Sequence, residues 1–165
     1  MDAQQAKDSR LELVRNSALA VELTGDQCHA LAEIMSVRDL EDGEILVGQG
    51  ASDDNLYAIV KGAVAVARQV EGSEWVTLHL LTKGDLAGEL GFMDGRPHYA
   101  ALRATGPTQV LCLPRERLES LLPREPMIVY RVMRAILRVV HVILNRMAMQ
   151  ASELTNYVYK VHGKY

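Results

Sequence analysis

Hydrophobic residues change their spacing twice along the chain, which divides it into three parts. Apolar positions recur every three or four residues from Leu11 to Val21 and again before residue 35, which predicts helices over 1–35. Short β-branched and apolar runs follow over 36–114 and predict β-strands. Helical spacing then returns and predicts C-terminal helices over 115–165. A chain of 165 residues forms one domain on this interpretation.

Glycines separate the predicted strands. Ten of the twelve lie between Gly43 and Gly106, and glycine permits the positive φ angles of tight turns, as at Lys61-Gly62 and Glu71-Gly72. Short strands with this punctuation are typical of a jelly roll or a similar two-sheet barrel. The predicted strands are Ser36–Leu40, Glu44–Val47, Leu56–Val60, Ala63–Gln69, Trp75–Leu81, Tyr99–Thr105 and Thr108–Leu113.

Three helix boundaries have recognisable signals. Thr24-Gly25-Asp26-Gln27 has the form of a capping box, which predicts a helix that begins after Thr24. A short helix is predicted over 115–122. Pro126 suits the first position of a helix, and a long helix is predicted from there to about Met149.

The predicted helix over 126–149 is apolar around most of its circumference. A helix on a single core needs an apolar face of only about 100°, so this one is expected to bury two sides, one on the β-structure and one in a homodimer. A helix lying on an anionic membrane surface is the alternative. Arginines inside the segment exclude a membrane span, because each costs about 2.5–3.5 kcal/mol near a bilayer centre. The coiled-coil repeat expected in the dimer is Met133, Ile136, Val140, Ile143 and Met147.

Composition removes several classes of function. The chain carries 18 Lys and Arg against 21 Asp and Glu, a net charge of −3, so it lacks the basic surplus of a nucleic-acid binder. Two cysteines, Cys28 and Cys112, and a polar N-terminus predict a cytoplasmic protein. The five histidines show no metal-ligand spacing and no serine lies in a nucleophile elbow. We therefore predict no enzymatic activity, metal or cofactor; a jelly-roll metalloenzyme is the weaker alternative.

The segment 83–101 is the richest in candidate chemistry. Gly88 precedes a predicted single turn of helix that starts at Glu89, and backbone N–H groups at such a turn form an anion-binding nest. The Glu89 carboxylate repels phosphate but accepts a hydrogen bond from a sugar hydroxyl. Arg96 and His98 add positive or switchable charge. The spacing alone fits either a phosphate-plus-sugar site or a plain barrel corner.

Two motifs resemble those of the cyclic nucleotide-binding domain family. Gly88-Glu89-Leu90 followed by Pro97-His98-Tyr99-Ala100 is similar to the family's phosphate-binding cassette, which reads Gly-Glu-Leu and then Pro-Arg-(Ser/Ala)-Ala. The upstream stretch Gly43–Val64 is similar to the family's β-roll signature. The resemblance covers roughly residues 31–144. It implies a mainly β fold, an eight-stranded β-roll or jelly roll flanked by helices, whose long last helix is both lid and dimer contact.

The resemblance also implies a ligand, cyclic AMP or cyclic GMP, and roles for particular residues. Glu89 would accept a hydrogen bond from the ribose 2′-hydroxyl. The backbone N–H groups of Gly88, Glu89 and Leu90 would surround the ribose and the cyclic phosphate, and Ala100 would donate its N–H to the phosphate.

One position departs from the family pattern. His98 stands where the family has an arginine that pairs with the phosphate, and Tyr99 stands where the family has a small residue. Arginine binds phosphate bidentately and is always charged, whereas a neutral histidine offers one donor. Losing a charged hydrogen bond costs about 1.5–3 kcal/mol, which is one to two decades in affinity. Arg96 lies two residues upstream and could replace the missing guanidinium.

These observations predict a regulatory sensor that binds a cyclic nucleotide weakly and signals through its C-terminal helix to an effector protein. The alternative is a β-roll that has lost its ligand and serves dimerisation or protein interaction. Helix phase places Arg138, His141 or Asn145 near the base. About sixteen residues follow Met149, too few for a helix-turn-helix, so we expect no DNA binding by this chain alone.

Overall fold

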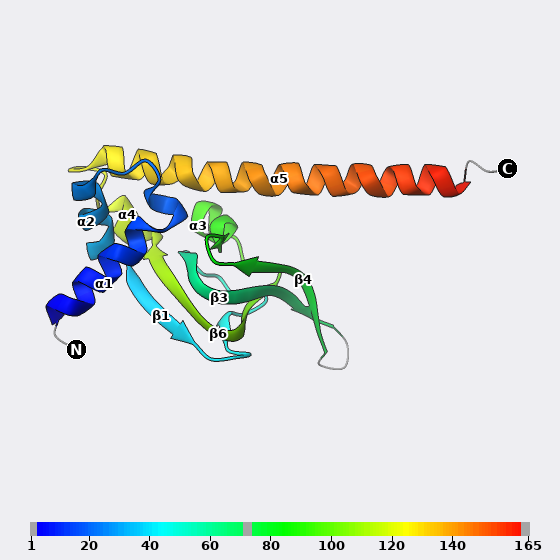
Figure 1. The fold of residues 1–165 in the computed structure, drawn as a ribbon, viewed down its shortest axis with the longest axis horizontal. Helices are drawn as coiled ribbons and strands as arrows, with labels where there is room; N and C mark the ends of the chain where they lie inside the picture. The colour runs from blue at the N-terminus through cyan, green and yellow to red at the C-terminus, as the bar shows by residue number, and fades with distance from the viewer. Residues whose placement is uncertain (1–2, 71–73, 163–165) are drawn as a thin grey trace.

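The computed structural model describes residues 3–70 and 74–162 (Figure 1). The predicted turn at Glu71-Gly72 lies outside the described residues. The helices are α1 (Ala3–Arg15), the 3-10 helix η1 (Ala18–Ala20), α2 (Gly25–Ile34), α3 (Glu89–Asp94), α4 (Arg115–Glu119) and α5 (Pro126–His162). The strands are β1 (Ser36–Leu40), β2 (Ile45–Val47), β3 (Asn55–Gln69), β4 (Trp75–Thr82), β5 (Leu86–Ala87) and β6 (Ala101–Pro114).

The described strands form one antiparallel sheet in the order β1-β6-β3-β4, with β2 paired to β6 and β5 paired to β3. Strands β3 and β6 each contain two of the predicted strands, because Gly62 and Gly106 lie within them rather than in turns. Counting the halves of these two strands separately turns the six strands into eight segments. The mainly β roll with flanking helices is therefore confirmed.

Close backbone approach explains why Gly62 bends β3 instead of ending it. Its φ angle is 78°, and a Cβ atom at this position would lie 2.5 Å from the carbonyl oxygen of Pro107. The Thr108 hydroxyl donates to the Ala63 carbonyl oxygen (2.9 Å) and accepts from the Ala63 N–H (3.2 Å), so it bridges the irregular pairing. The two strands thus stay paired through a bend that shifts their register between Ile59 and Ala63.

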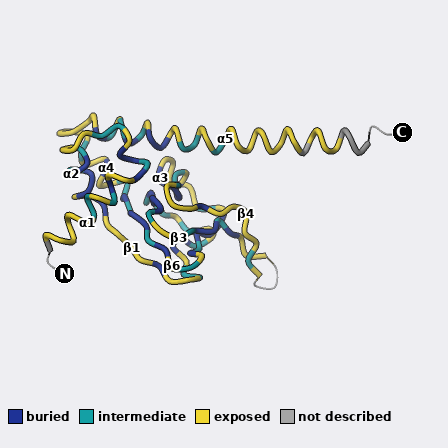
Figure 2. Tube along the Cα trace, viewed as in Figure 1, coloured by how far each residue is buried: buried dark blue, intermediate teal, exposed yellow. Residues whose placement is uncertain are grey.

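The buried residues form two hydrophobic clusters (Figure 2). One fills the roll, with Val64 and Val110 fully buried. The other joins the roll to the helices, and Phe92 of α3 and Val132 of α5 lie inside it. The helix expected to reach Val21 ends at Arg15, and the Val21 side chain is 72% exposed. The cluster that joins the roll to the helices packs the first half of α5 against the domain.

The capping box at Thr24 is confirmed. The Thr24 hydroxyl accepts from the Gln27 N–H (3.4 Å), and the Gln27 side chain accepts from the Thr24 N–H (3.1 Å). The same Gln27 side-chain oxygen accepts a hydrogen bond from the Arg131 guanidinium at 2.6 Å. The start of α2 is therefore tied to α5.

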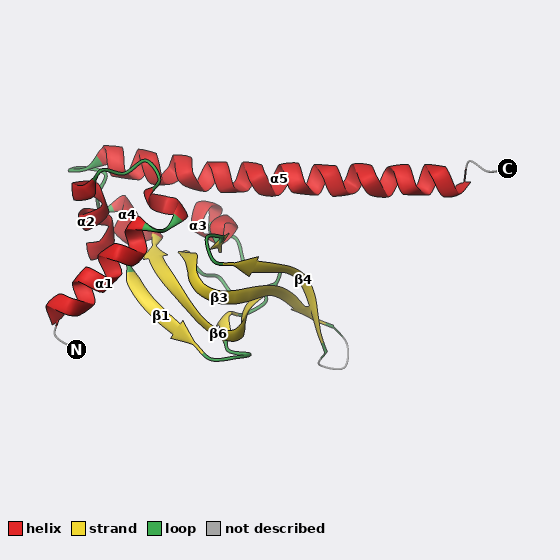
Figure 3. Ribbon diagram, viewed as in Figure 1, coloured by secondary structure: helices red, strands yellow, loops and turns green. Residues whose placement is uncertain are grey.

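Helix α5 begins at Pro126 as predicted and is longer than predicted, with 37 residues that end at His162 (Figure 3). Glu22 forms ion pairs with Arg138, which also donates a hydrogen bond to it, and with Arg134 at 3.3 Å. These ion pairs hold the first half of α5 to the N-terminal segment. Its second half runs on beyond the helices that pack around its start. Within the described residues, no helix is long and apolar enough to cross a bilayer.

The expected coiled-coil seam on α5 is wrong, because those residues face the domain. Ile136 is buried, Met133 and Val140 pack against the core, and Ile143 and Met147 line a cavity. A neighbouring face of the helix carries a different set of exposed apolar residues at heptad spacing: Tyr130, Leu137 and Leu144. Both faces of the helix are apolar, so hydrophobicity alone does not indicate which one meets the core.

Candidate functional site

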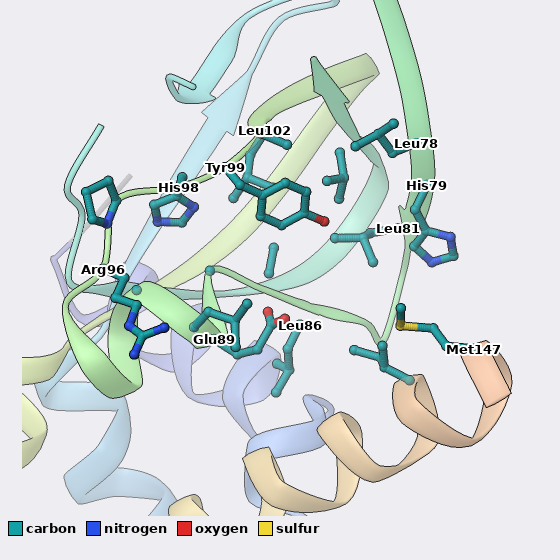
Figure 4. Close-up of a pocket in the computed structure, with 18 of the residues that line it drawn as sticks. Leu78, His79, Leu81, Leu86, Glu89, Arg96, His98, Tyr99, Leu102 and Met147 are labelled. Atoms are coloured by element: carbon teal, nitrogen blue, oxygen red, sulfur yellow. The ribbon is translucent and has the colours of Figure 1, made fainter. Parts of the chain in front are cut away.

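A cavity of about 580 Å³ lies between α3, the segment 96–100, β4 and α5 (Figure 4). Its volume suits a ligand of nucleotide size. The predicted site residues come together here, since all seven line it: Gly88, Glu89, Leu90, Arg96, His98, Tyr99 and Ala100. Aliphatic side chains supply much of the remaining wall: Val66, Leu78, Leu81, Leu86, Leu102 and Ile143.

Helix α3 starts at the cavity and confirms the predicted helical turn. Gly88 precedes it with a φ of 81°, and the Gly88 carbonyl oxygen accepts from the Phe92 N–H at 3.0 Å. A Cβ atom on Gly88 would lie 2.7 Å from the Asn55 carbonyl oxygen and 3.3 Å from the Tyr57 ring. Glycine is therefore required here by both conformation and space, and it positions Glu89 as the first residue of α3.

The Glu89 side chain is half-buried and directed into the cavity (Figure 4). Burial raises the pKa of its carboxyl, while a hydrogen bond from its own backbone N–H and the charge of His98 oppose that rise. Within the described part of the chain, no other side chain donates to this carboxylate. A buried acceptor with unused capacity fits a donor supplied by a ligand, such as a sugar hydroxyl.

A partly buried polar network supports the floor behind Gly88. Asp53 accepts hydrogen bonds from the Tyr57 hydroxyl (2.5 Å), the Asn55 N–H (3.0 Å) and the Asn55 amide (2.5 Å). Burial and the neighbouring Asp53 raise the pKa of Tyr57, so its hydroxyl stays a donor. The ring that contacts Gly88 is therefore locked in place.

His98 is tied by its backbone to the loop that follows β2. Its N–H donates to the Ala51 carbonyl oxygen (2.9 Å), and its own carbonyl oxygen accepts from the Gly50 N–H (2.7 Å). Its Nε2 atom is buried and has no hydrogen-bond partner among the described residues. A Cβ atom on Gly91 would lie 2.8 Å from this nitrogen, so the ring packs closely on α3. Most buried polar side-chain atoms have a hydrogen-bond partner, so this unpartnered nitrogen is an exception.

Tyr99 and Arg96 lie on either side of His98. The Tyr99 side chain is 61% exposed, and its ring projects over the middle of the cavity (Figure 4). Arg96 is 82% exposed and pairs with Asp94 at 3.1 Å. Arg96 thus lines the cavity but is engaged with a carboxylate, so it does not replace the family arginine in this conformation.

Sequence reasoning missed the residues of α5 that roof the cavity. These are Ile143, Arg146, Met147 and Gln150, whereas Arg138 pairs with Glu22 and neither His141 nor Asn145 lines the cavity. The four lining residues follow the i, i+3, i+4, i+7 spacing of one helix face. That spacing was visible in the sequence, but the direction of the face was not.

Four side chains of types that can ligate metals line the cavity, two imidazoles and two carboxylates. No group of three or more His, Cys, Asp or Glu side chains in the part of the chain that the structure describes could hold a metal ion. His79 lies across the cavity from His98 on β4, and the two carboxylates that line the cavity are Glu89 and Asp94.

Comparison with known proteins gives a consistent result. A model of the cyclic nucleotide-binding domain matches residues 37–125. The chain is 30% identical over 95 residues to the cAMP-dependent protein kinase regulatory subunit of Dictyostelium discoideum; the match covers 56% of this chain and 29% of that protein. The chain therefore spans less than a third of that relative's length.

Solved structures share the fold. A cyclic nucleotide-binding domain from Methylobacillus flagellatus superimposes with a TM-score of 0.73 at 24% identity, over 87% of this chain and 81% of that one. The Catabolite Activator Protein of Thermus thermophilus gives 0.69 at 25% identity, over 84% and 63%. Because the family model matches more than half of the residues, this chain belongs to the cyclic nucleotide-binding domain family.

Proposed function

We propose that this chain is a non-enzymatic regulatory module that binds a cyclic nucleotide weakly and signals through α5. The observation that carries the proposal is Glu89, an incompletely satisfied carboxylate at the start of α3, which faces a nucleotide-sized cavity roofed by α5. The ribose hydroxyl would donate to Glu89. The cyclic phosphate would lie at the α3 end of the cavity, near Ala100 and His98.

We expect weak affinity because little positive charge is available at the phosphate end of the cavity. The Arg96 guanidinium pairs with Asp94, and His98 offers a single imidazole in place of a guanidinium. Charged hydrogen bonds contribute about 1.5–3 kcal/mol each, so replacing one lowers affinity by about one to two decades. A cyclic nucleotide should therefore bind with an affinity near the weak end of the range for a sensor.

Restoring the arginine tests this proposal. Isothermal titration calorimetry with cyclic AMP and cyclic GMP should show binding that tightens about tenfold or more in His98→Arg. Absence of heat at millimolar ligand, at pH 6 and at pH 7.5, would contradict the proposal.

A charge-matched variant controls for long-range electrostatics. His29 is exposed on α2, away from the cavity, so His29→Arg adds the same charge without touching the site. Its affinity should equal that of the wild type. Equal gains from His29→Arg and His98→Arg would show that net charge, rather than a contact at His98, governs binding.

A second candidate function is a β-roll that binds no nucleotide and serves protein interaction. The Tyr99 ring over the cavity favours it, because a nucleotide must share that space or displace the ring. On this alternative, His98→Arg with Tyr99→Ala would bind cyclic nucleotide and the wild type would not. The same calorimetry therefore separates the two functions.

The route of signalling is also part of the proposal. Ligand binding shifts an equilibrium only if the ligand has different affinities for its two states. The first half of α5 is buried and ion-paired, whereas the second half meets the roll mainly through residues that line the cavity. A ligand under this second half would change its position, and an effector or a second copy in the cytoplasm would sense the change.

We place the dimer contact on the outward heptad of α5. Tyr130, Leu137 and Leu144 are 54%, 63% and 55% exposed, and they recur every seven residues, which is the spacing of one core position of a coiled-coil heptad. Size-exclusion chromatography with light scattering should give twice the 18.3 kDa of one chain. Leu137→Glu combined with Leu144→Glu should give the monomer mass with an unchanged circular dichroism spectrum. Leu122→Glu, an exposed site outside α5, should leave the dimer intact, and a wild-type monomer at tens of micromolar would contradict the assignment.

A further inference from the structure

The end of the cavity beneath α5 contains a guanidinium without a carboxylate partner. Arg146 lines the cavity from α5, and it forms no ion pair with any residue that the structure describes. The other cavity arginine, Arg96, is paired with Asp94 at the opposite end. Arg146 is therefore the lining cation whose charge is left for a ligand.

His79 orients this guanidinium. An Nη atom of Arg146 lies 3.4 Å from His79 Nε2 on β4, and a guanidinium only donates, so the imidazole nitrogen accepts. This contact uses one N–H of Arg146, and the others stay free. Both residues also border a smaller cavity of about 170 Å³ beneath α5, so the pair stands where the two cavities meet.

The position of Glu89 divides the cavity into a phosphate end and a base end. On the proposed function, the ribose lies at Glu89 and the phosphate lies toward Ala100, which leaves the part of the cavity between β4 and α5 for the purine. Figure 4 shows Leu78, Leu81 and His79 on one side of this part and Met147 on the other. Apolar side chains would cover the faces of a purine there, and the Arg146–His79 pair would meet its edge.

Purines differ at that edge in a way that a guanidinium detects. Guanine presents two acceptors, O6 and N7, which arginine binds bidentately, whereas adenine replaces O6 with an amino donor that faces the guanidinium N–H groups. Gln150 on the next turn of α5 both donates and accepts, so it suits either base. We propose that Arg146, oriented by His79, reads the base and makes this module prefer cyclic GMP to cyclic AMP. This inference rests on the proposed function.

Calorimetry with three nucleotides and the full chain tests the inference. Wild-type protein should bind cyclic GMP about tenfold more tightly than cyclic AMP. Cyclic IMP, which keeps O6 and N7 but lacks the 2-amino group, should bind like cyclic GMP. In Arg146→Gln, cyclic GMP should lose about tenfold, whereas cyclic AMP should bind as before or more tightly because glutamine pairs with adenine N6 and N7. The same series in a His98→Arg background brings weak affinities into the measurable range.

Arg134→Gln is the matched control, because it removes the same charge from α5 away from the cavity. It should leave the ratio of the two affinities unchanged. Equal losses for cyclic GMP and cyclic AMP in Arg146→Gln would overturn the inference and would place the phosphate, rather than the base, at Arg146. Binding of cyclic AMP as tight as that of cyclic GMP would overturn it while leaving the proposed function intact. No binding of any of the three would overturn both.

Discussion

Glu89→Gln is expected to weaken cyclic nucleotide binding about ten- to hundredfold and to make the ligand-free protein more stable at neutral pH. The affinity falls because glutamine keeps the shape but loses the charge that accepts the ribose hydroxyl, and a hydrogen bond to a charged group contributes about 1.5–3 kcal/mol. Calorimetry with cyclic AMP and its 2′-deoxy analogue tests whether the 2′-hydroxyl is the ligand group that Glu89 binds. If Glu89 meets the 2′-hydroxyl, the deoxy analogue should bind wild type and variant equally.

The gain in stability follows from the raised pKa of Glu89. Because burial raises the pKa of this carboxyl above its ordinary value of 4.5, the folded protein holds the proton more tightly than the unfolded chain. The contribution of this carboxyl to the free energy of unfolding is then greatest below that value and falls as the pH rises through the raised pKa. Glutamine does not titrate, so the variant lacks this fall.

Thermal unfolding measured from pH 4 to pH 8 tests the second part. The melting temperatures of wild type and Glu89→Gln should agree at the acid end and diverge as the pH rises, with the variant higher by about 2–4 °C for a difference of about 1 kcal/mol. Glu119→Gln serves as the control, since that carboxylate is exposed and lies outside the cavity. If the melting temperatures of Glu89→Gln and wild type change in parallel with pH, ionisation of the Glu89 carboxyl has no cost in the folded state.

Glycine spacing made the β-roll predictable, but it also led to the main error in the strands, because two glycines predicted as turns lie inside strands. Gly88 and Gly95 do flank α3 with positive φ angles. Gly62 and Gly106 have the same backbone preference, yet β3 and β6 continue through them. At Gly62 the strand continues because the Pro107–Thr108 backbone, which is distant in sequence, packs against the bend.

The phosphate cassette could be found from sequence because its residues are neighbours along the chain. Glu89, His98 and Ala100 reach the same cavity through one turn of helix and one loop. The roof of that cavity could not be found, because its place depends on the rotation of α5 about its own axis. Ile136 and Leu137 are adjacent and equally apolar, but the first is buried and the second is 63% exposed.

Gly88→Ala is expected to destabilise the protein strongly, because it adds a methyl group at a crowded position with a positive φ angle. The φ of 81° costs an alanine about 1–2 kcal/mol, because an L-residue there brings its Cβ atom against the backbone. The new atom would also lie 2.7 Å from the Asn55 carbonyl oxygen and 3.3 Å from the Tyr57 ring, and crowding of this kind costs about 1–3 kcal/mol more. A total of about 3 kcal/mol lowers the melting temperature by roughly 6–12 °C.

Gly106→Ala separates these two costs. Gly106 has a φ of 74°, but a Cβ atom added there would meet nothing within 4 Å, so this variant bears the backbone cost alone. Its melting temperature should fall by about half as much as that of Gly88→Ala, and its affinity for cyclic nucleotide should not change. Gly88→Ala should also lose binding, because relieving the contact with Asn55 moves the first turn of α3 and the Glu89 carboxylate with it. Equal losses of stability in the two variants would show that the loop shifts freely, and that the Asp53–Tyr57 network does not hold Glu89 in position.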